Sequence, residues 1–302
     1  METNWYSVGG RQRIRLRDTY VRDVVGPLLA TSATGVAKLD IVLRGLAMQS
    51  DAAEGRVPAD ISWEMLHDWC RDRDTYRADR RLKQKWINDK LIRLESLGLL
   101  SRRSLPGRQS EIIMLSDRYD LAPFDDPGAR GDSYVTVLGD LMRFDLFGAW
   151  GAPELSAHLA AMNAERYARI DPLLSQNEKL EDRPFGGGRW FRPLSWFADT
   201  EQHRPAEHIR YRFSDRTLRR GLKSLSKQGL VAQEWISRDP RTAKEFDKGP
   251  RVLYHNGFDD MRGDAESRRA RLWQRVDNAD RNRALPLSQS GLWIGQVQGA
   301  AH

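Results

Sequence analysis

Residues 214–231, SDRTLRRGLKSLSKQGLV, contain the pattern that decides the expected fold. Leucines recur in this stretch at spacings of four and three residues, which predicts a helix with one buried face. Ser214 is a suitable N-cap, and Gly229 stands where glycine commonly ends a helix. The side chains left to project outward from this helix are mainly basic: Arg216, Thr217, Arg219, Arg220 and Lys223.

A similar pattern stands earlier in the chain, at residues 80–91, RRLKQKWINDKL. The spacing predicts a helix from Tyr76 to about Leu97, with an apolar stripe formed by Leu82, Trp86, Ile87, Leu91 and Leu94. The polar residues of this helix are expected largely elsewhere on its surface: Arg80, Arg81, Lys83, Gln84, Lys85, Asn88 and Lys90. Both helices therefore combine an apolar face with a basic one.

A glycine and a predicted β-hairpin follow each of these two helices. The first hairpin is expected to pair residues 99–103 with 112–115, and the second to pair 230–236 with 251–255. Basic residues in and beside the turns are suited to contacts with phosphates or a minor groove, although solvated hairpin tips would have the same composition. These residues are Arg102, Arg103 and Arg108 in the first hairpin, and Arg238, Arg241, Lys244, Lys248 and Arg251 in the second.

The capped, arginine-rich helix followed by Gly229-Leu230-Val231 and a hairpin resembles the recognition helix and wing of bacterial winged helix-turn-helix DNA-binding proteins. The earlier segment, with Leu97-Gly98-Leu99 before its hairpin, resembles the same family less closely. Two such units in one chain resemble the tandem winged helices of plasmid replication initiators and of some transcription regulators. The resemblance covers about residues 34–116 and 191–256, and it implies a mainly α fold with small β-hairpins, built from tandem winged-helix domains.

Four regions are expected along the chain. Residues 1–30 would form an N-terminal basic arm and helix, and residues 31–120 the first winged-helix domain. Residues 132–257 would form the second winged-helix domain with a helical insertion, and residues 262–302 a C-terminal basic helix and tail. The stretch 117–132 is rich in Asp, Pro and Gly, which indicates a boundary between domains.

The flanking segments leave two alternatives open. Arginines alternate with other residues from Arg11 to Arg17, which is typical of a charged edge strand but would also suit an arm in the minor groove. The arginine-rich C-terminal helix, expected at 263–284, could pair two subunits of a homodimer or dock on its own chain. The other expected helices are 18–30, with a bend at Gly26-Pro27, then 34–49, a short helix capped by Ser62 that contains Trp63 to Cys70, 135–150, 154–170 and a short helix at 194–200.

The composition describes a folded, basic protein. The 302 residues include 49 Lys and Arg against 42 Asp and Glu, a net charge of +7, and 40% are hydrophobic. The positive charge is clustered, with 12 basic against 5 acidic residues in 71–108 and 13 against 6 in 203–251. A single cysteine, the lack of a signal-peptide pattern and the lack of a long apolar stretch lead us to expect a cytoplasmic protein without a membrane partner. DNA binding, as the resemblance implies it, would make the protein nucleoid-associated.

The motifs of common catalytic and cofactor sites are not found. His203 and His208 lack the spacing and the third ligand of a metal site, and Gly186-Gly187-Gly188 lacks the lysine of a phosphate loop. Cys70 is expected to be a small buried hydrophobe, and the acidic residues near the second turn match no nuclease pattern. The expectation is a protein without cofactor, metal or enzymatic activity. Five tryptophans are expected in the core rather than against bases: Trp63, Trp69, Trp86, Trp196 and Trp235.

The sequence therefore predicts a protein that binds double-stranded DNA, with Arg216, Thr217, Arg219 and Arg220 reading bases. Arg80, Arg81, Gln84 and Lys85 would have the equivalent role in the first domain. A sequence-preferring transcription regulator is the expected role. A plasmid or phage replication initiator that binds origin repeats is the first alternative, and a winged-helix module that holds protein partners is the second, although basic helix faces count against it.

Overall fold

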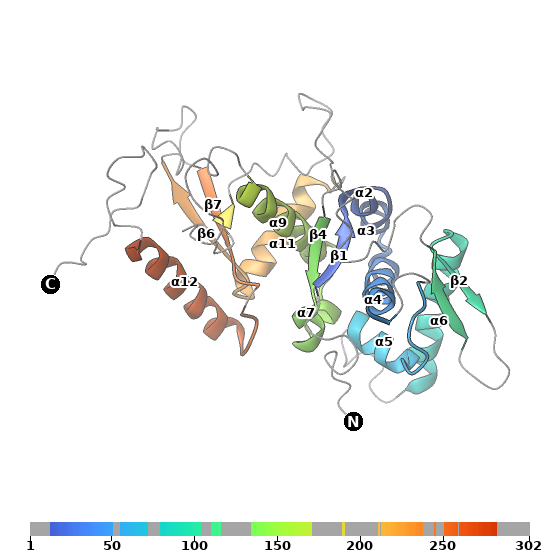
Figure 1. The fold of residues 1–302 in the computed structure, drawn as a ribbon. Helices are drawn as coiled ribbons and strands as arrows, with labels where there is room; N and C mark the ends of the chain where they lie inside the picture. Colours follow the sequence, from blue (N-terminus) through green and yellow to red (C-terminus); the bar gives the residue numbers. More distant parts are fainter. Residues whose placement is uncertain are drawn as a thin grey trace.

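A computed structural model of the chain describes residues 13–50, 55–71, 79–103, 110–115, 134–170, 189–190, 211, 213–237, 245, 251–258 and 260–282. The described residues form a mainly helical fold with small antiparallel sheets (Figure 1). This confirms the expected fold class at that level. His203, His208, Gly186-Gly187-Gly188, Trp196 and the C-terminal tail lie outside the described residues.

The first half of the chain begins with strand β1 (Arg13–Arg17), in which Ile14 and Leu16 are buried. A continuous helical run follows, made of α2 (Asp18–Tyr20), the π-helix η1 (Val21–Val25) and α3 (Gly26–Ala30). Pro27 has no N–H for the carbonyl group four residues earlier, and the helix widens into a π-turn just before it. The predicted strand and the predicted helix over residues 18–30 are thus both confirmed, and the irregularity in the helix is a π-turn just before Gly26.

Three longer helices and a hairpin complete this half: α4 (Thr34–Ser50), α5 (Trp63–Cys70), α6 (Arg80–Ser96), β2 (Leu100–Arg103) and β3 (Glu111–Met114). Side chains cap two of the helices, because Ser62 Oγ accepts from Met65 N at 3.2 Å and Asp79 Oδ1 accepts from Leu82 N at 3.0 Å. Arg56, between α4 and α5, forms an antiparallel bridge to Ile113. The order across this small sheet is therefore Arg56, β3, β2.

The second half contains β4 (Tyr134–Leu138), α7 (Asp140–Arg143), α8 (Leu146–Ala149), α9 (Ala152–Ile170), β5 (Arg189–Trp190), α11 (Asp215–Lys227), β6 (Val231–Ile236), β7 (Arg251–Asn256) and α12 (Ala265–Asn282). Its sheet has the strand order β5-β7-β6. Strand β5, which precedes α11, thus lies next to the second strand of the hairpin, as the Arg56 bridge does in the first half.

The prediction of one helix over residues 135–150 is wrong. Val135 and Val137 are both buried and alternate with more exposed neighbours in β4, which pairs with β1. Asp145 has φ 57°, a left-handed conformation that separates the short helices α7 and α8. The apolar spacing of this stretch suits a strand followed by two turns of helix as well as it suits one helix, and only the pairing with β1 distinguishes them.

The two halves face each other in a two-fold-like arrangement. Each begins with a strand, and β1 and β4 pair antiparallel with Arg15 opposite Thr136 at the centre. Two glycines then make reciprocal close contacts. A Cβ on Gly148 would lie 2.7 Å from the carbonyl oxygen of Arg71 in the first half, and a Cβ on Gly26 would collide with that of Tyr211 in the second. One continuous hydrophobic core spans both halves.

Candidate nucleic-acid interface

Helix α11 forms as the sequence predicts. Ser214 Oγ accepts a hydrogen bond from Thr217 N at 3.1 Å and caps the helix, and Gly229 follows it with φ 70°. Leu218, Gly221, Leu222 and Leu225 are buried against the core. Gly221 is required there, because a Cβ would lie 2.7 Å from that of Ala157 on α9 and would overlap the carbonyl group of Pro153. The packing on α9 therefore determines which face of α11 meets solvent.

The opposite face of α11 carries an unbroken row of cations. Arg216, Arg219, Arg220, Lys223 and Lys227 are all exposed, and we call them the α11 basic stripe. With about 100° of rotation per residue, they fall within an arc of about 100° on the helix surface. Lys227 was not among the predicted site residues, although its position four residues after Lys223 would have indicated it.

Most of the stripe is unengaged in the described part of the chain. Arg219 Nε contacts Asp215 Oδ2 at 2.6 Å while 69% of its side chain remains exposed. This hydrogen bond raises the pKa of Arg219 above its ordinary value. Arg216, Arg220 and Lys223 make no ion pair or hydrogen bond there. Thr217 is half-buried, and its hydroxyl lies 2.7 Å from Ser214 Oγ, so its hydroxyl is occupied at the cap.

Basic side chains from α12 support α11 from its other end. Arg268 Nε donates to the carbonyl oxygen of Gln228 at 2.8 Å, and Arg269 Nη2 donates to that of Lys227 at 2.9 Å. Cations at a helix C-terminus satisfy its last carbonyl groups and complement its dipole. The outer face of the β6–β7 hairpin contacts α12 through Leu272 and Val276, so the C-terminal helix docks on its own chain.

The equivalent face of α6 is less basic than predicted. Arg81 and Lys85 are exposed and make no ion pair or hydrogen bond among the described residues, and Gln84 is half-buried. Arg80 is exposed but forms an ion pair with Glu64. An acidic residue and two apolar ones share this surface with them: Asp89, Leu82 and Ile92.

The expected apolar stripe of α6 is wrong by one position at its start. Leu82 is 41% exposed, whereas Lys83 is 9% exposed and lines the buried face with Ile87, Leu91 and Leu94. The charge of the Lys83 ammonium is balanced there by Asp68 on α5, because Nζ donates to Asp68 Oδ1 at 2.6 Å. Although burial raises the pKa of Asp68, hydrogen bonds from His67 and Lys83 lower it overall.

The two hairpin turns lie largely outside the described part of the chain. Arg108, Arg238, Arg241 and Lys244 lie outside the described residues. Arg102 does not project from the first hairpin, because Nη2 donates to Glu95 Oε2 at 2.8 Å and Nη1 to Asn88 Oδ1 at 3.0 Å. This side chain fastens β2 to α6 instead of extending to a phosphate.

The expectation that the tryptophans lie in the core holds only in part. Trp69 is 2% exposed, and Trp63 and Trp86 are half-buried against the core. Trp235, on β6, is 72% exposed, so its assignment to the core is wrong. A strand pattern shows which residues share a face, but it does not show where along the strand the covering helix ends.

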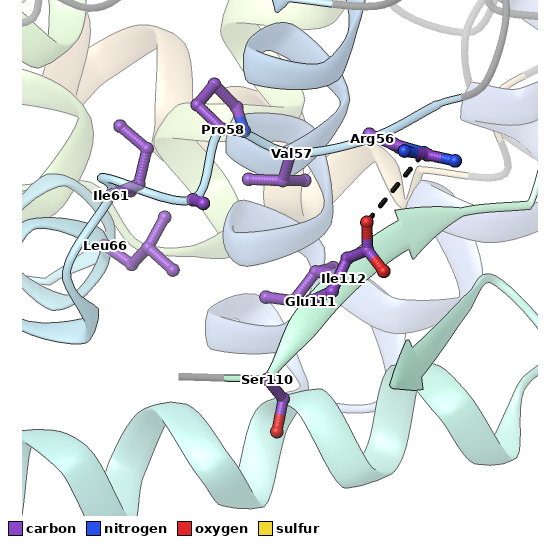
Figure 2. A pocket seen from close by; sticks show the side chains of 9 residues that line it. Arg56, Val57, Pro58, Ile61, Leu66, Ser110, Glu111 and Ile112 are labelled. Atoms are coloured by element: carbon purple, nitrogen blue, oxygen red, sulfur yellow. Dashed lines mark ion pairs between the residues drawn. The ribbon is translucent and has the colours of Figure 1, made fainter. Parts of the chain in front are cut away.

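A pocket of about 230 Å³ lies where the Arg56–Ala59 segment meets β3 (Figure 2). Val57, Ile61, Leu66 and Ile112 give it an apolar floor. The two charged residues among its described lining residues, Arg56 and Glu111, contact each other at 3.8 Å, as Figure 2 shows.

Cys70 is buried, and burial raises the pKa of its thiol to about 12, which leaves it unreactive. Among the described residues, no three His, Cys, Asp or Glu side chains gather in a way that could hold a metal ion. None of the helices in the described part is long and apolar enough to span a bilayer.

Comparisons with protein-family models, with curated proteins and with solved structures gave no match to this chain.

Proposed function

We propose that this protein binds double-stranded DNA and that the α11 basic stripe is its principal contact. The observation that carries the proposal is the exposure of Arg216, Arg219, Arg220, Lys223 and Lys227 on one face of a helix whose other face is buried. An α-helix fits the major groove, and an exposed arginine there can donate two hydrogen bonds to guanine O6 and N7. Side chains at the C-terminal end of the stripe would instead contact phosphates.

The arrangement of the elements supports a tandem winged-helix architecture. In the first half a helix, a bridging residue, two helices and a hairpin follow one another, and the bridge lies beside the second hairpin strand. In the second half, β5 lies beside β7 in the same way, and α11 precedes the hairpin. On this proposal, α11 would be the recognition helix and the β6–β7 hairpin would be its wing.

The two halves would contribute unequally to DNA binding. The five cations of the α11 basic stripe contrast with α6, where Arg81 and Lys85 are exposed beside Asp89 and Leu82. We therefore assign the main affinity to α11, and to α6 a weaker contact through Arg81 and Lys85, with Arg80 and Gln84 at its margin.

The biological role that fits best is that of a sequence-preferring transcription regulator acting on DNA in the cytoplasm. A tandem winged-helix architecture would favour a replication initiator as the second candidate, because two unlike reading units would suit a long origin repeat. The two roles predict different DNA. A regulator would select one operator near a promoter, and an initiator would select a motif that recurs as direct repeats in an origin.

The test is selection of fragments from a pool of random 30-bp duplexes by the purified full-length chain at about 50 mM salt, followed by sequencing. We expect enrichment of a motif, and retention of the pool at low salt even before enrichment. The proposal is wrong if the chain retains no duplex at that salt concentration.

A further inference from the structure

Trp235 is the most exposed large apolar side chain among the described residues, with 72% of its surface in contact with solvent. Tryptophan offers a large apolar surface with few rotatable bonds, so little conformational freedom is lost when it enters a contact. Its backbone is held in the β6–β7 ladder, opposite Val252. Trp235 is therefore an anchored aromatic side chain that the protein's own fold leaves uncovered.

The side of the sheet on which Trp235 lies follows from the strand alternation. Val231, Gln233 and Trp235 share one face of β6, and Val231 belongs to the core formed with α9 and α11. The opposite face holds Ala232, which packs with Leu272 of α12. Figure 1 shows the hairpin between α12 on one side and α9 and α11 on the other. Trp235 thus lies on the α11 side of the sheet.

The first turns of α11 lie close to this face. Tyr254, which pairs with Gln233, interacts electrostatically with both Arg219 and Asp215. Gln233 is the neighbour of Trp235 on the same face of β6. Helix α11, with its basic stripe, and the indole of Trp235 therefore lie on the same side of the β6–β7 sheet.

We propose that Trp235 is a wedge that enters the minor groove beside the major-groove site of α11 and unstacks a base step. This inference rests on the proposed function, since it assumes that α11 binds duplex DNA. Apolar side chains inserted between base steps open the stack and kink the duplex, and the cations of α11 would hold the flanking phosphates while this occurs. The expected ligand is a duplex that is easily unstacked at one point.

The test compares two 30-bp duplexes, one fully paired and one with a central two-base mismatch, in fluorescence anisotropy titrations. For the parent protein we expect binding about tenfold tighter to the mismatched duplex, because its stack is already weakened. Trp235→Ala should bind both duplexes alike, and Trp235→Phe should keep most of the preference. Trp273→Ala, which removes a tryptophan from α12 on the other side of the sheet, is the matched control and should keep it fully.

Energy transfer between dyes on the two ends of the paired duplex gives a second readout. The parent protein should shorten the end-to-end distance, and Trp235→Ala should not, while melting curves confirm that the variant is folded. Equal preference and equal bending in the parent and in Trp235→Ala would overturn the wedge and leave the proposed function intact. Arg216→Ala/Arg220→Ala should weaken binding to both duplexes by the same factor. If the parent protein binds neither duplex, the proposed function fails, and the wedge fails with it.

Discussion

Asp18 accepts a hydrogen bond from the side-chain amide of Asn163 at 3.1 Å, across the boundary between the two halves of the chain. The hydroxyl of Tyr211 donates to the same carboxylate oxygen, and Asn163 Nδ2 also lies 2.6 Å from that hydroxyl. All three side chains are at most 2% exposed. Because Asp18 directly follows β1, Asn163 lies on α9 and Tyr211 precedes α11, this cluster holds the helix that carries the basic stripe against the first half.

Replacing Asp18 with Ala should therefore lower the free energy of unfolding by about 3 kcal/mol, because two buried donors lose their shared acceptor. Urea denaturation measures the change. Asp23→Ala is the matched control, since Asp23 is an exposed aspartate that pairs with Arg22 at the surface, and its removal should cost less than about 1 kcal/mol. Equal denaturation midpoints for the two variants would contradict the assigned role of the cluster.

Acid should destabilise the fold through His158. Burial lowers its pKa to about 3 from 6.5, and its ring contacts Phe258 with 4.6 Å between centroids. Between these two pH values the unfolded chain binds a proton that the folded chain excludes, so stability is complete above pH 6.5 and falls as the pH decreases towards 3. The loss in free energy of unfolding that His158 causes should be about 2 kcal/mol between pH 6.5 and pH 5.

The measurement is urea denaturation at these two pH values for the parent and for His158→Leu. The variant should be destabilised by about 2 kcal/mol less than the parent on acidification, whatever its stability at neutral pH. An identical decrease in both proteins would show that His158 is not the group responsible.

Two neighbouring lysines of α6 should give opposite results when each is replaced with Ala. Lys83 is paired with Asp68 at 2.6 Å and is largely buried, so Lys83→Ala should lower the free energy of unfolding by about 2 kcal/mol. Lys85 is exposed, so Lys85→Ala should change stability by less than about 0.5 kcal/mol while weakening DNA binding slightly. Thermal melting together with gel-shift titration separates the two effects, and a lower stability of Lys85→Ala would argue against the observed register of α6.

DNA affinity should depend on the α11 basic stripe rather than on net charge alone. Arg216→Ala/Arg220→Ala should weaken binding by about 1–3 kcal/mol for each arginine that reads a base. Arg93→Ala/Arg262→Ala removes the same charge from exposed positions outside the stripe and should have a much smaller effect. Titrations of a fluorescent duplex compare the two double variants, and equal decreases in affinity would indicate binding without a defined site.

Salt should weaken the complex steeply. If six to ten phosphates are neutralised, affinity should fall by about three to five orders of magnitude between roughly 50 and 200 mM salt. Replacing Lys223 or Lys227 should make the plot of log affinity against log salt concentration less steep, each by the contribution of about one phosphate. A flat salt response would exclude an interface dominated by phosphates and point to a protein partner instead.

The sequence alone determined the helices that carry their own boundary signals. The cap Ser214, the leucine spacing and Gly229 define α11, and the cap Ser62 begins α5, because each signal involves residues within a few positions of one another. For the same reason the exposed arginines of α11 could be predicted, since a helix with one buried face leaves the opposite face to solvent.

Other features depend on distant partners and follow from the tertiary structure alone. Residues 134–138 are a strand because β1 pairs with them, and Lys83 is buried because Asp68 on another helix neutralises it. Trp235 is exposed although it shares a face of β6 with the buried Val231, and Asp18 is buried because Asn163 and Tyr211 donate to it from the other half. A local pattern restricts which side chains share a face, but the free energy that selects the buried face comes from contacts between segments far apart in the chain.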